Sequence, residues 1–142
     1  MKTEKFDERQ LQIRGDVFKH GFLTAGALML FNAFLQDMGV EWANGFHQNI
    51  LMLILIITVV SIEFHLRGVY FGRGSRRNAF MVIFGLCSIV LLVLSVIHYA
   101  QGKKFVVGYR LTDNGFYIAG GLMFLISTIC ALVQFFREKK AD

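Results

Sequence analysis

The sequence is poor in charge and in cysteine, and it has no proline. Charged residues make up 18% of the 142 residues, against about a quarter in a soluble domain. Cys87 and Cys130 both lie within apolar segments, which predicts buried structural thiols and argues against a disulfide framework or a zinc site. Neither a Ser/His/Asp arrangement nor a glycine-rich phosphate loop is present, so no enzyme class and no cofactor is indicated.

The charges are excluded from four long apolar runs, and these runs predict the architecture. They cover residues 17–38, 46–66, 79–99 and 115–136. Each has about 20 residues, the length at which an α-helix crosses the ~30 Å hydrocarbon core of a bilayer. Backbone amides in lipid must be satisfied within their own segment, which requires helices. The sequence therefore predicts an all-α fold: a single integral membrane domain built as a four-helix transmembrane bundle of antiparallel up-down hairpins.

Residues 1–16 form a charged arm before the first run. The arm is acidic as well as basic, and the apolar run after it is longer than that of a signal peptide, so we do not expect a cleaved leader. Apolar residues alternate with charges in the arm, a pattern that an interfacial helix leading into the first span would show.

Lysine and arginine are distributed unevenly between the connections, and this predicts the orientation. Twelve of the 15 lie in the arm and the start of the first run, in the second connection, and in the tail: Lys2, Lys5, Arg9, Arg14, Lys19, Arg67, Arg73, Arg76, Arg77, Arg137, Lys139 and Lys140. The first connection has none and the third has three: Lys103, Lys104 and Arg110. The positive-inside rule therefore predicts that both termini are cytoplasmic. Because the basic residues lie in short connections, the net charge of +5 indicates membrane topology rather than nucleic-acid binding.

The connections are short, which predicts that sequential helices are antiparallel neighbours. The longest connection, residues 100–114, has two β-prone runs around Gly108 and ends in an Asn-Gly pair, typical of a turn. A small hairpin is one alternative there, and a loop is the structure that we expect.

Glu63 is an acid within the second run, and a charge at the bilayer centre costs about 2.5–3.5 kcal/mol on insertion scales. In the predicted orientation it lies near the cytoplasmic interface, four residues before Arg67, in the order that favours a helical ion pair. One interpretation is therefore a helix-end ion pair of Glu63 and Arg67. The other is a proton or cation site, since acids within a membrane span are functional candidates by default.

His20 and His65 lie in the same predicted polar layer as Glu63, and all three are ligand types for a divalent metal. Glu63 and His65 are two residues apart, however, which places them about 200° apart around a helix. They cannot easily face the same point, and we therefore predict no metal site in this layer.

Other polar and small residues within the runs predict contacts between helices. Asn32, Gln36 and Gln134 are expected to hydrogen-bond to another helix. Small residues also recur, at Gly21 in the first run and along the fourth at Gly120, Gly121, Ser127 and Ala131. Such residues let helices approach closely, within the chain or in a dimer.

Two short motifs flank the first two runs. The first is Asp7-Glu8-Arg9-Gln10, followed by Ile13-Arg14-Gly15; the second is Ile62-Glu63, followed by Leu66-Arg67-Gly68 and Tyr70-Phe71. Together they resemble a type of uncharacterised small four-helix integral membrane proteins of Gram-positive bacteria, and the likeness covers about half of the chain. The resemblance implies a bacterial plasma-membrane protein and brings no activity with it. By the predicted topology both motifs are cytoplasmic. Opposite charges on one face lead to the hypothesis that Asp7 and Glu8 pair with an arginine of the second connection: Arg67, Arg73, Arg76 or Arg77.

These observations favour a non-enzymatic membrane component that associates with itself or with another membrane protein. The alternative is a small transporter or channel that is cation-coupled through Glu63. The partners expected are the lipid bilayer and a second copy or another membrane protein, with no nucleic acid and no cofactor.

Overall fold

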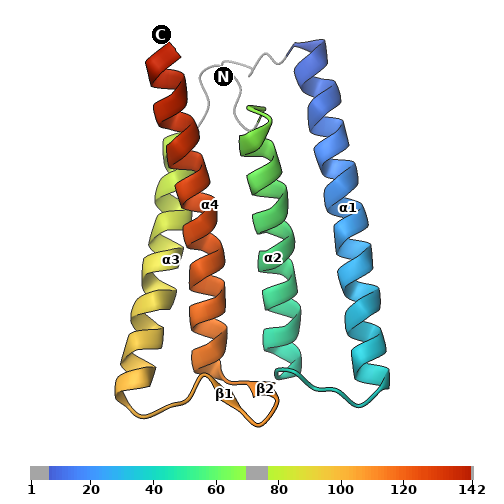
Figure 1. The fold of residues 1–142 in the computed structure, drawn as a ribbon, viewed down its shortest axis with the longest axis vertical. Helices are drawn as coiled ribbons and strands as arrows, with labels where there is room; N and C mark the ends of the chain where they lie inside the picture. The colour runs from blue at the N-terminus through green and yellow to red at the C-terminus, as the bar shows by residue number, and fades with distance from the viewer. Residues whose placement is uncertain (1–6, 70–76, 142) are drawn as a thin grey trace.

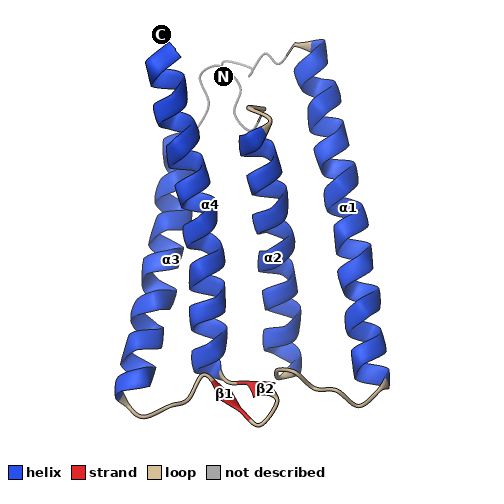
Figure 2. Ribbon diagram, in the orientation of Figure 1, coloured by secondary structure: helices blue, strands red, loops and turns tan. Residues whose placement is uncertain are grey.

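The computed structural model describes residues 7–69 and 77–141, which form four long helices (Figure 1). They are α1 (Glu8–Asp37), α2 (Gly45–Leu66), α3 (Arg77–Ala100) and α4 (Asp113–Ala141). Each is long and apolar enough to cross a membrane. The predicted all-α fold is therefore confirmed, and Figure 2 shows that helices account for nearly all of the described chain.

α1 begins within the charged arm, at Glu8 rather than at residue 17. Asp7 is the residue that caps it: its Oδ1 accepts a hydrogen bond from the backbone N–H of Gln10 at 2.7 Å, and Gln10 Oε1 accepts one from Asp7 N. This reciprocal pair satisfies two of the free amides at the helix start. The arm from residue 8 onward is therefore the first part of α1 and not a separate interfacial helix.

The four helices form a row in the order α1, α2, α4, α3 (Figure 1). α1 packs along α2, α2 along α4, and α4 along α3. The expectation that sequential helices are neighbours is correct for α1 and α2 and for α3 and α4. It is wrong for α2 and α3, which have no extended contact among the described residues, although the rings of His65 and Phe80 meet near one end. α2 lies parallel to α4 instead, because the two antiparallel pairs join through their second helices.

The row has two distinct ends (Figure 1). α1 begins and α4 finishes at one end, which we call the terminal end. The opposite end holds the α1–α2 connection and the α3–α4 connection, and we call it the hairpin end. An even number of helix passes returns the chain to the side on which it started.

The α3–α4 connection contains a small hairpin where a loop was expected. Its strands, β1 (Val106–Val107) and β2 (Arg110–Leu111), pair antiparallel, so that Val107 faces Arg110. Gly108 occupies the first turn position with φ +61°, a conformation that favours glycine. The Asn-Gly pair is not a hairpin turn, because Asn114 and Gly115 lie in the first turn of α4.

Close helix packing uses the small residues that the sequence suggested. A Cβ on Gly121 would lie 2.9 Å from the Leu92 side chain of α3, and one on Gly21 would lie 2.5 Å from Val60 of α2. Ser127 and Ala131 of α4 are fully buried. The small residues of α4 therefore serve contacts within the chain.

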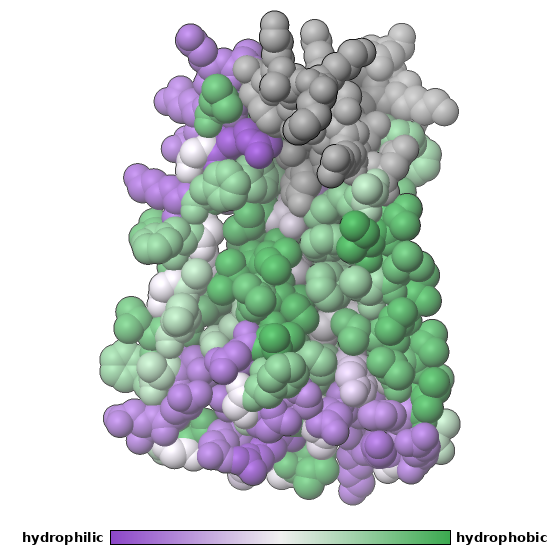
Figure 3. Space-filling view, turned by 180° about the vertical axis from the view of Figure 1, so that it is seen from behind, coloured by the Kyte–Doolittle hydropathy of each residue, from purple (hydrophilic) through white to green (hydrophobic). Residues whose placement is uncertain are grey.

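Large apolar side chains cover the surface between the two ends. Figure 3 shows a hydrophobic band across one face, bounded at the hairpin end by hydrophilic residues. Phe22 of α1 is 80% exposed and Leu66 of α2 is 77% exposed. Cys87 is also exposed, on α3, so the prediction that both thiols are buried was wrong for this residue. Water-soluble proteins rarely expose apolar surface so continuously, whereas helices that face lipid do.

Candidate functional site

Glu63 lies at the centre of a charged cluster at the terminal end. Its Oε1 is 2.6 Å from Nη2 of Arg67, one turn further along α2, and 2.8 Å from Nδ1 of His20 on α1. The Glu63 side chain retains 22% of its exposure and that of His20 retains 50%. The structure thus brings together His20, Glu63 and Arg67, and the cluster joins α1 to α2.

A second contact joins the same two helices one to two turns nearer the start of α1. Nη1 of Arg14 donates to the carbonyl of Val69 at 2.9 Å, and the guanidinium lies 5.3 Å from the centre of the Phe64 ring. A guanidinium over an aromatic face gains electrostatic energy in addition to the hydrogen bond. Val69 itself is buried against Val17, so this contact is part of a small apolar core.

His65 lies on a different side of α2 and does not join the Glu63 cluster. It is buried, its Nδ1 is 2.5 Å from the carbonyl oxygen of Ser61, and its ring packs 5.6 Å from that of Phe80 on α3. His20 and His65 therefore do not share a site. In residues 7–69 and 77–141, no three His, Cys, Asp or Glu side chains come together in a way that could hold a metal ion.

The cytoplasmic charge motif predicted from the sequence is only partly within the described residues. Asp7 caps α1, and Glu8 and Arg9 are exposed in its first turn. Arg73 and Arg76 lie outside the described residues, as does the side chain of Arg77. Pairing between the acidic motif and this arginine connection therefore stays a prediction.

The hairpin end holds a buried polar network that sequence reasoning missed. Asn114, at the start of α4, is 1% exposed. Its Oδ1 accepts a hydrogen bond from Ser95 of α3 at 2.7 Å, and its Nδ2 donates to the carbonyl of Lys103 at 2.9 Å. The signal in the sequence was the Asn-Gly pair itself, which we interpreted as a turn instead of as a helix start.

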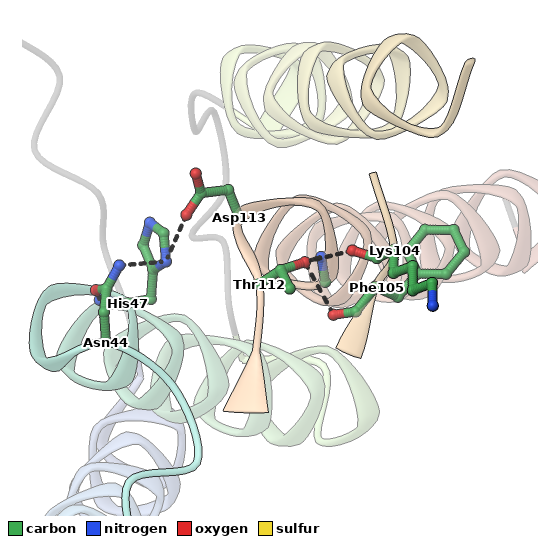
Figure 4. A network of polar contacts seen from close by, with 7 residues as sticks. Asn44, His47, Lys104, Phe105, Thr112 and Asp113 are labelled. Atoms are coloured by element: carbon green, nitrogen blue, oxygen red, sulfur yellow. Dashed lines mark hydrogen bonds and ion pairs between the residues drawn. The ribbon is translucent and has the colours of Figure 1, made fainter. Parts of the chain in front are cut away.

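Thr112 extends this network across the connection, as Figure 4 shows. Its hydroxyl is 2.6 Å from the carbonyl oxygen of Lys104 and 3.0 Å from that of Phe105, and it also lies 3.3 Å from the backbone N of Gly115. Gly115 is required there, because a Cβ would lie 2.3 Å from the Phe105 carbonyl oxygen. The start of α4 is thus tied to the chain that follows α3.

His47 joins α2 to α4 at the same end. Its Nδ1 is 3.0 Å from the amide nitrogen of Asn44, the residue that caps α2, and 3.5 Å from Oδ1 of Asp113 (Figure 4). Its ring stacks on Phe116 with ring centres 4.3 Å apart. The single Nδ1 either accepts from the Asn44 amide or donates to the Asp113 carboxylate, so it makes one of these hydrogen bonds at a time. The aromatic stack and the approach to Asp113 join the two helix starts.

The α1–α2 connection is held by a further set of hydrogen bonds. Gln36 of α1 donates to Oε1 of Gln48 on α2 at 2.9 Å, which confirms the expected bond between helices for this residue. Gln48 is 2% exposed and donates in turn to the carbonyl of Ala43 at 2.9 Å. These bonds link the end of α1 to the start of α2 through side chains that are themselves paired.

The hairpin docks on the same connection. The backbone N–H of Leu111 donates to the carbonyl of Trp42 at 2.6 Å. Arg110 forms an ion pair with the Glu41 carboxylate, and its Nε donates to the Glu41 carbonyl at 3.2 Å. Two connections far apart in the sequence are therefore joined into one cap.

Two open apolar grooves lie beside α2, at different heights along the helix. The first, about 520 Å³, lies between α1 and α2 towards the terminal end and includes Arg14 and Ser61 in its lining. The second, about 490 Å³, lies between α1, α2 and α4 below the cap. We call this second one the capped groove; it is lined by Leu28, Phe31, Asn32, Leu35, Trp42, Leu51, Met52, Leu55, Leu111, Ala119 and Met123. Neither groove contains Glu63.

No family model, curated protein or solved structure matches this chain. Its function must therefore be inferred from its own fold and contacts.

Proposed function

We propose that the chain is a multi-pass protein of the bacterial plasma membrane, with both termini cytoplasmic, and that it acts without catalysis by associating with a second copy or with another membrane protein. The observation that carries this proposal is the open row of helices. Among the described residues, α1 has extended helix packing with α2 alone, and α3 with α4 alone. Each edge of the row therefore leaves most of one long apolar helix without a protein neighbour.

The membrane location is supported by four helices of spanning length and by the apolar band that hydrophilic residues bound at the hairpin end. The orientation is supported by the excess of lysine and arginine at the terminal end and in the second connection. Both arguments depend on the distribution of residue types. The accessibility of each terminus to protease or to a label, measured from either side of the membrane, would test the location and the orientation.

Association is supported by the makeup of the α1 edge. Gly15 and Gly26 have no other atom within 4 Å of the position where a Cβ would lie. A glycine in the middle of a helix costs about 1 kcal/mol relative to alanine, and here no contact within the described chain requires it. Small residues at free positions of a membrane helix allow another helix to approach closely.

Cation-coupled transport is less well supported, because Glu63 is already paired. Its carboxylate contacts Arg67 and His20 near the end of α2 and lines neither groove beside that helix. An acid that carries a cation is expected to face a polar cavity deeper in the membrane. Reconstituted vesicles with Glu63→Gln separate the two functions, since ion flux that depends on Glu63 would favour the transporter.

Native mass measurement in discs of native lipid tests the association directly. We expect a complex larger than one chain. Gly26→Trp on α1 and Val90→Trp on α3 add bulk at exposed positions of the two edge helices, and the variant that reduces the complex identifies the edge used. A single chain at every concentration, with no other protein attached, would contradict the proposal.

A further inference from the structure

The capped groove contains one polar side chain with unused hydrogen-bonding capacity. Asn32 of α1 is 7% exposed and lines the groove. Its Oδ1 accepts a hydrogen bond from Nε1 of Trp42 at 2.9 Å. An indole N–H can only donate, so this bond fixes the carboxamide with its oxygen towards Trp42 and its NH₂ group away from it. In the described chain, that NH₂ group has no acceptor.

The rest of the groove is apolar and is shaped by three helices. Leu51, Met52 and Leu55 of α2 lie between walls from α1 and α4, and Trp42 with Leu111 closes the hairpin end. The α4 wall includes Ala119, whose small side chain leaves room between α1 and α4. A volume of about 490 Å³ lies within the ordinary range for small-molecule sites, roughly 300–1,000 Å³.

Asn32 also lies at an informative depth. It is five residues before the end of α1 at Asp37, which places it about 7 Å along the helix from that end. If the helices cross a bilayer, as the proposed function requires, this level is near the boundary of the hydrocarbon core, where interfacial tryptophans such as Trp42 are found. Ester carbonyls of membrane lipids lie at this boundary, with their acyl chains directed towards the bilayer centre.

We propose that the capped groove binds one acyl chain of an ester-linked phospholipid, whose carbonyl oxygen accepts a hydrogen bond from Nδ2 of Asn32. The chain fills the space along Leu51 and Leu55, and the headgroup remains at the hairpin end. An apolar side chain from a partner helix would fill the same space but leave the amide donor unpaired, which is unfavourable for a buried group. The carbonyl of a lipid ester satisfies that donor.

Fluorescence of Trp42 tests this proposal without a label, because Trp42 is the only tryptophan in the chain. The full chain is placed in lipid discs that contain a small fraction of phospholipid with brominated acyl chains, which quench tryptophan on contact. A lipid site predicts quenching that exceeds the bulk fraction of brominated lipid and saturates. Quenching in simple proportion to the bulk fraction would show only general contact with lipid and would overturn the proposal.

Two comparisons locate the site and its hydrogen bond. Ala119→Phe fills the groove and should return quenching to the bulk proportion, whereas the matched Val90→Phe, at an exposed position of α3, should not. Ester-linked lipid should bind roughly three- to tenfold more tightly than the ether-linked lipid with the same chains, the expected effect of one hydrogen bond. Equal affinity for the ester- and ether-linked lipids would show that Asn32 does not bind the lipid carbonyl. Equal effects of Ala119→Phe and Val90→Phe would show that the lipid does not bind in the capped groove.

The outcome is distinguishable from failure of the membrane proposal on which it rests. A chain that does not enter lipid discs refutes the membrane location. One that enters the discs and shows only proportional quenching refutes the lipid site alone. If Trp42 became better protected from quenching as the number of chains per disc rose, a second copy would occupy the groove. That result would also overturn the lipid site.

Discussion

At the hairpin end, buried polar side chains bind backbone carbonyls across connections. At the terminal end, the described polar ties between α1 and the end of α2 come from partly exposed side chains, His20 to Glu63 and Arg14 to the Val69 carbonyl. Asn114 and Gln48 are almost fully buried, and each bonds to the backbone of a connection. His20 and Arg67, which contact Glu63, are 50% and 39% exposed. The difference indicates that the hairpin end holds the helices and their connections together more firmly than the terminal end does.

Physical chemistry explains why a buried polar network can hold a connection in one arrangement. In the proposed membrane location, lipid is as apolar as leucine, so the burial of apolar side chains gives little preference for one helix neighbour over another. An unsatisfied buried amide, in contrast, costs about 1–3 kcal/mol. An arrangement that separated Asn114 or Gln48 from the backbone carbonyls they bind would carry that cost. The half-exposed ion pairs of the terminal end have water as an alternative partner and are correspondingly weak.

The largest expected effect comes from Gly115 at the hairpin end. In Gly115→Ala, the new Cβ would lie 2.3 Å from the Phe105 carbonyl oxygen, which is backbone and cannot rotate away. We expect a loss of about 3 kcal/mol in the free energy of unfolding, the upper range for overpacking. Equilibrium unfolding in mixed detergent micelles measures it.

Gly26→Ala is the matched control, since a Cβ there meets no atom within 4 Å and alanine favours the helix by about 1 kcal/mol. If Gly26→Ala stabilises the protein and Gly115→Ala destabilises it, the hairpin end is tightly packed as the comparison of the two ends requires. If the two variants were equally stable, the hairpin end would not be the rigid one.

Asn114→Ala should have the next largest effect. The change removes the acceptor of Ser95 and the donor to Lys103, both in buried or half-buried surroundings, so we expect a loss of about 2 kcal/mol. A double-mutant cycle with Ser95→Ala should give a coupling of about 1 kcal/mol, because the two side chains share one hydrogen bond. Strict additivity would mean that Asn114 acts through the Lys103 carbonyl alone.

Hydrophobic runs predicted the four helices, because spanning length and exclusion of charge depend only on local sequence. The helix order could not be predicted in this way. The contact between α2 and α4 depends on residues far apart in the sequence, such as Leu111 with the Trp42 carbonyl and His47 with Phe116, and the sequence does not show that these residues will meet. The Glu63–Arg67 contact could be predicted because the two residues are four apart on one helix. The contact of Glu63 with His20 could not, because His20 lies on another helix.

At the terminal end, Glu63→Gln should destabilise by about 1 kcal/mol or less. It weakens the contacts to Arg67 and His20, but both partners are more than a third exposed and can be hydrated. Asp16→Asn, at an exposed acid one turn before His20 on α1, is the control for loss of a negative charge. Unfolding in the same micelles measures both, and a loss above about 3 kcal/mol for Glu63→Gln alone would indicate a buried, desolvated pair instead.

The smallest effect is expected for Glu41→Gln, although Glu41 lies at the more rigid end. Its ion pair with Arg110 is exposed on both sides, at 61% and 57%, and the backbone bonds from Arg110 Nε and Leu111 N to this connection remain. We expect a change within about 0.5 kcal/mol, reduced further by salt. Unfolding of Glu41→Gln is measured in low and high salt and compared with that of Asn114→Ala. This comparison distinguishes two explanations for the stronger contacts at the hairpin end. If burial decides the strength of each tie, Glu41→Gln has less effect than Asn114→Ala at the same end. If position at the hairpin end decides it, the two variants lose similar stability, and the cap would have to act as one cooperative unit.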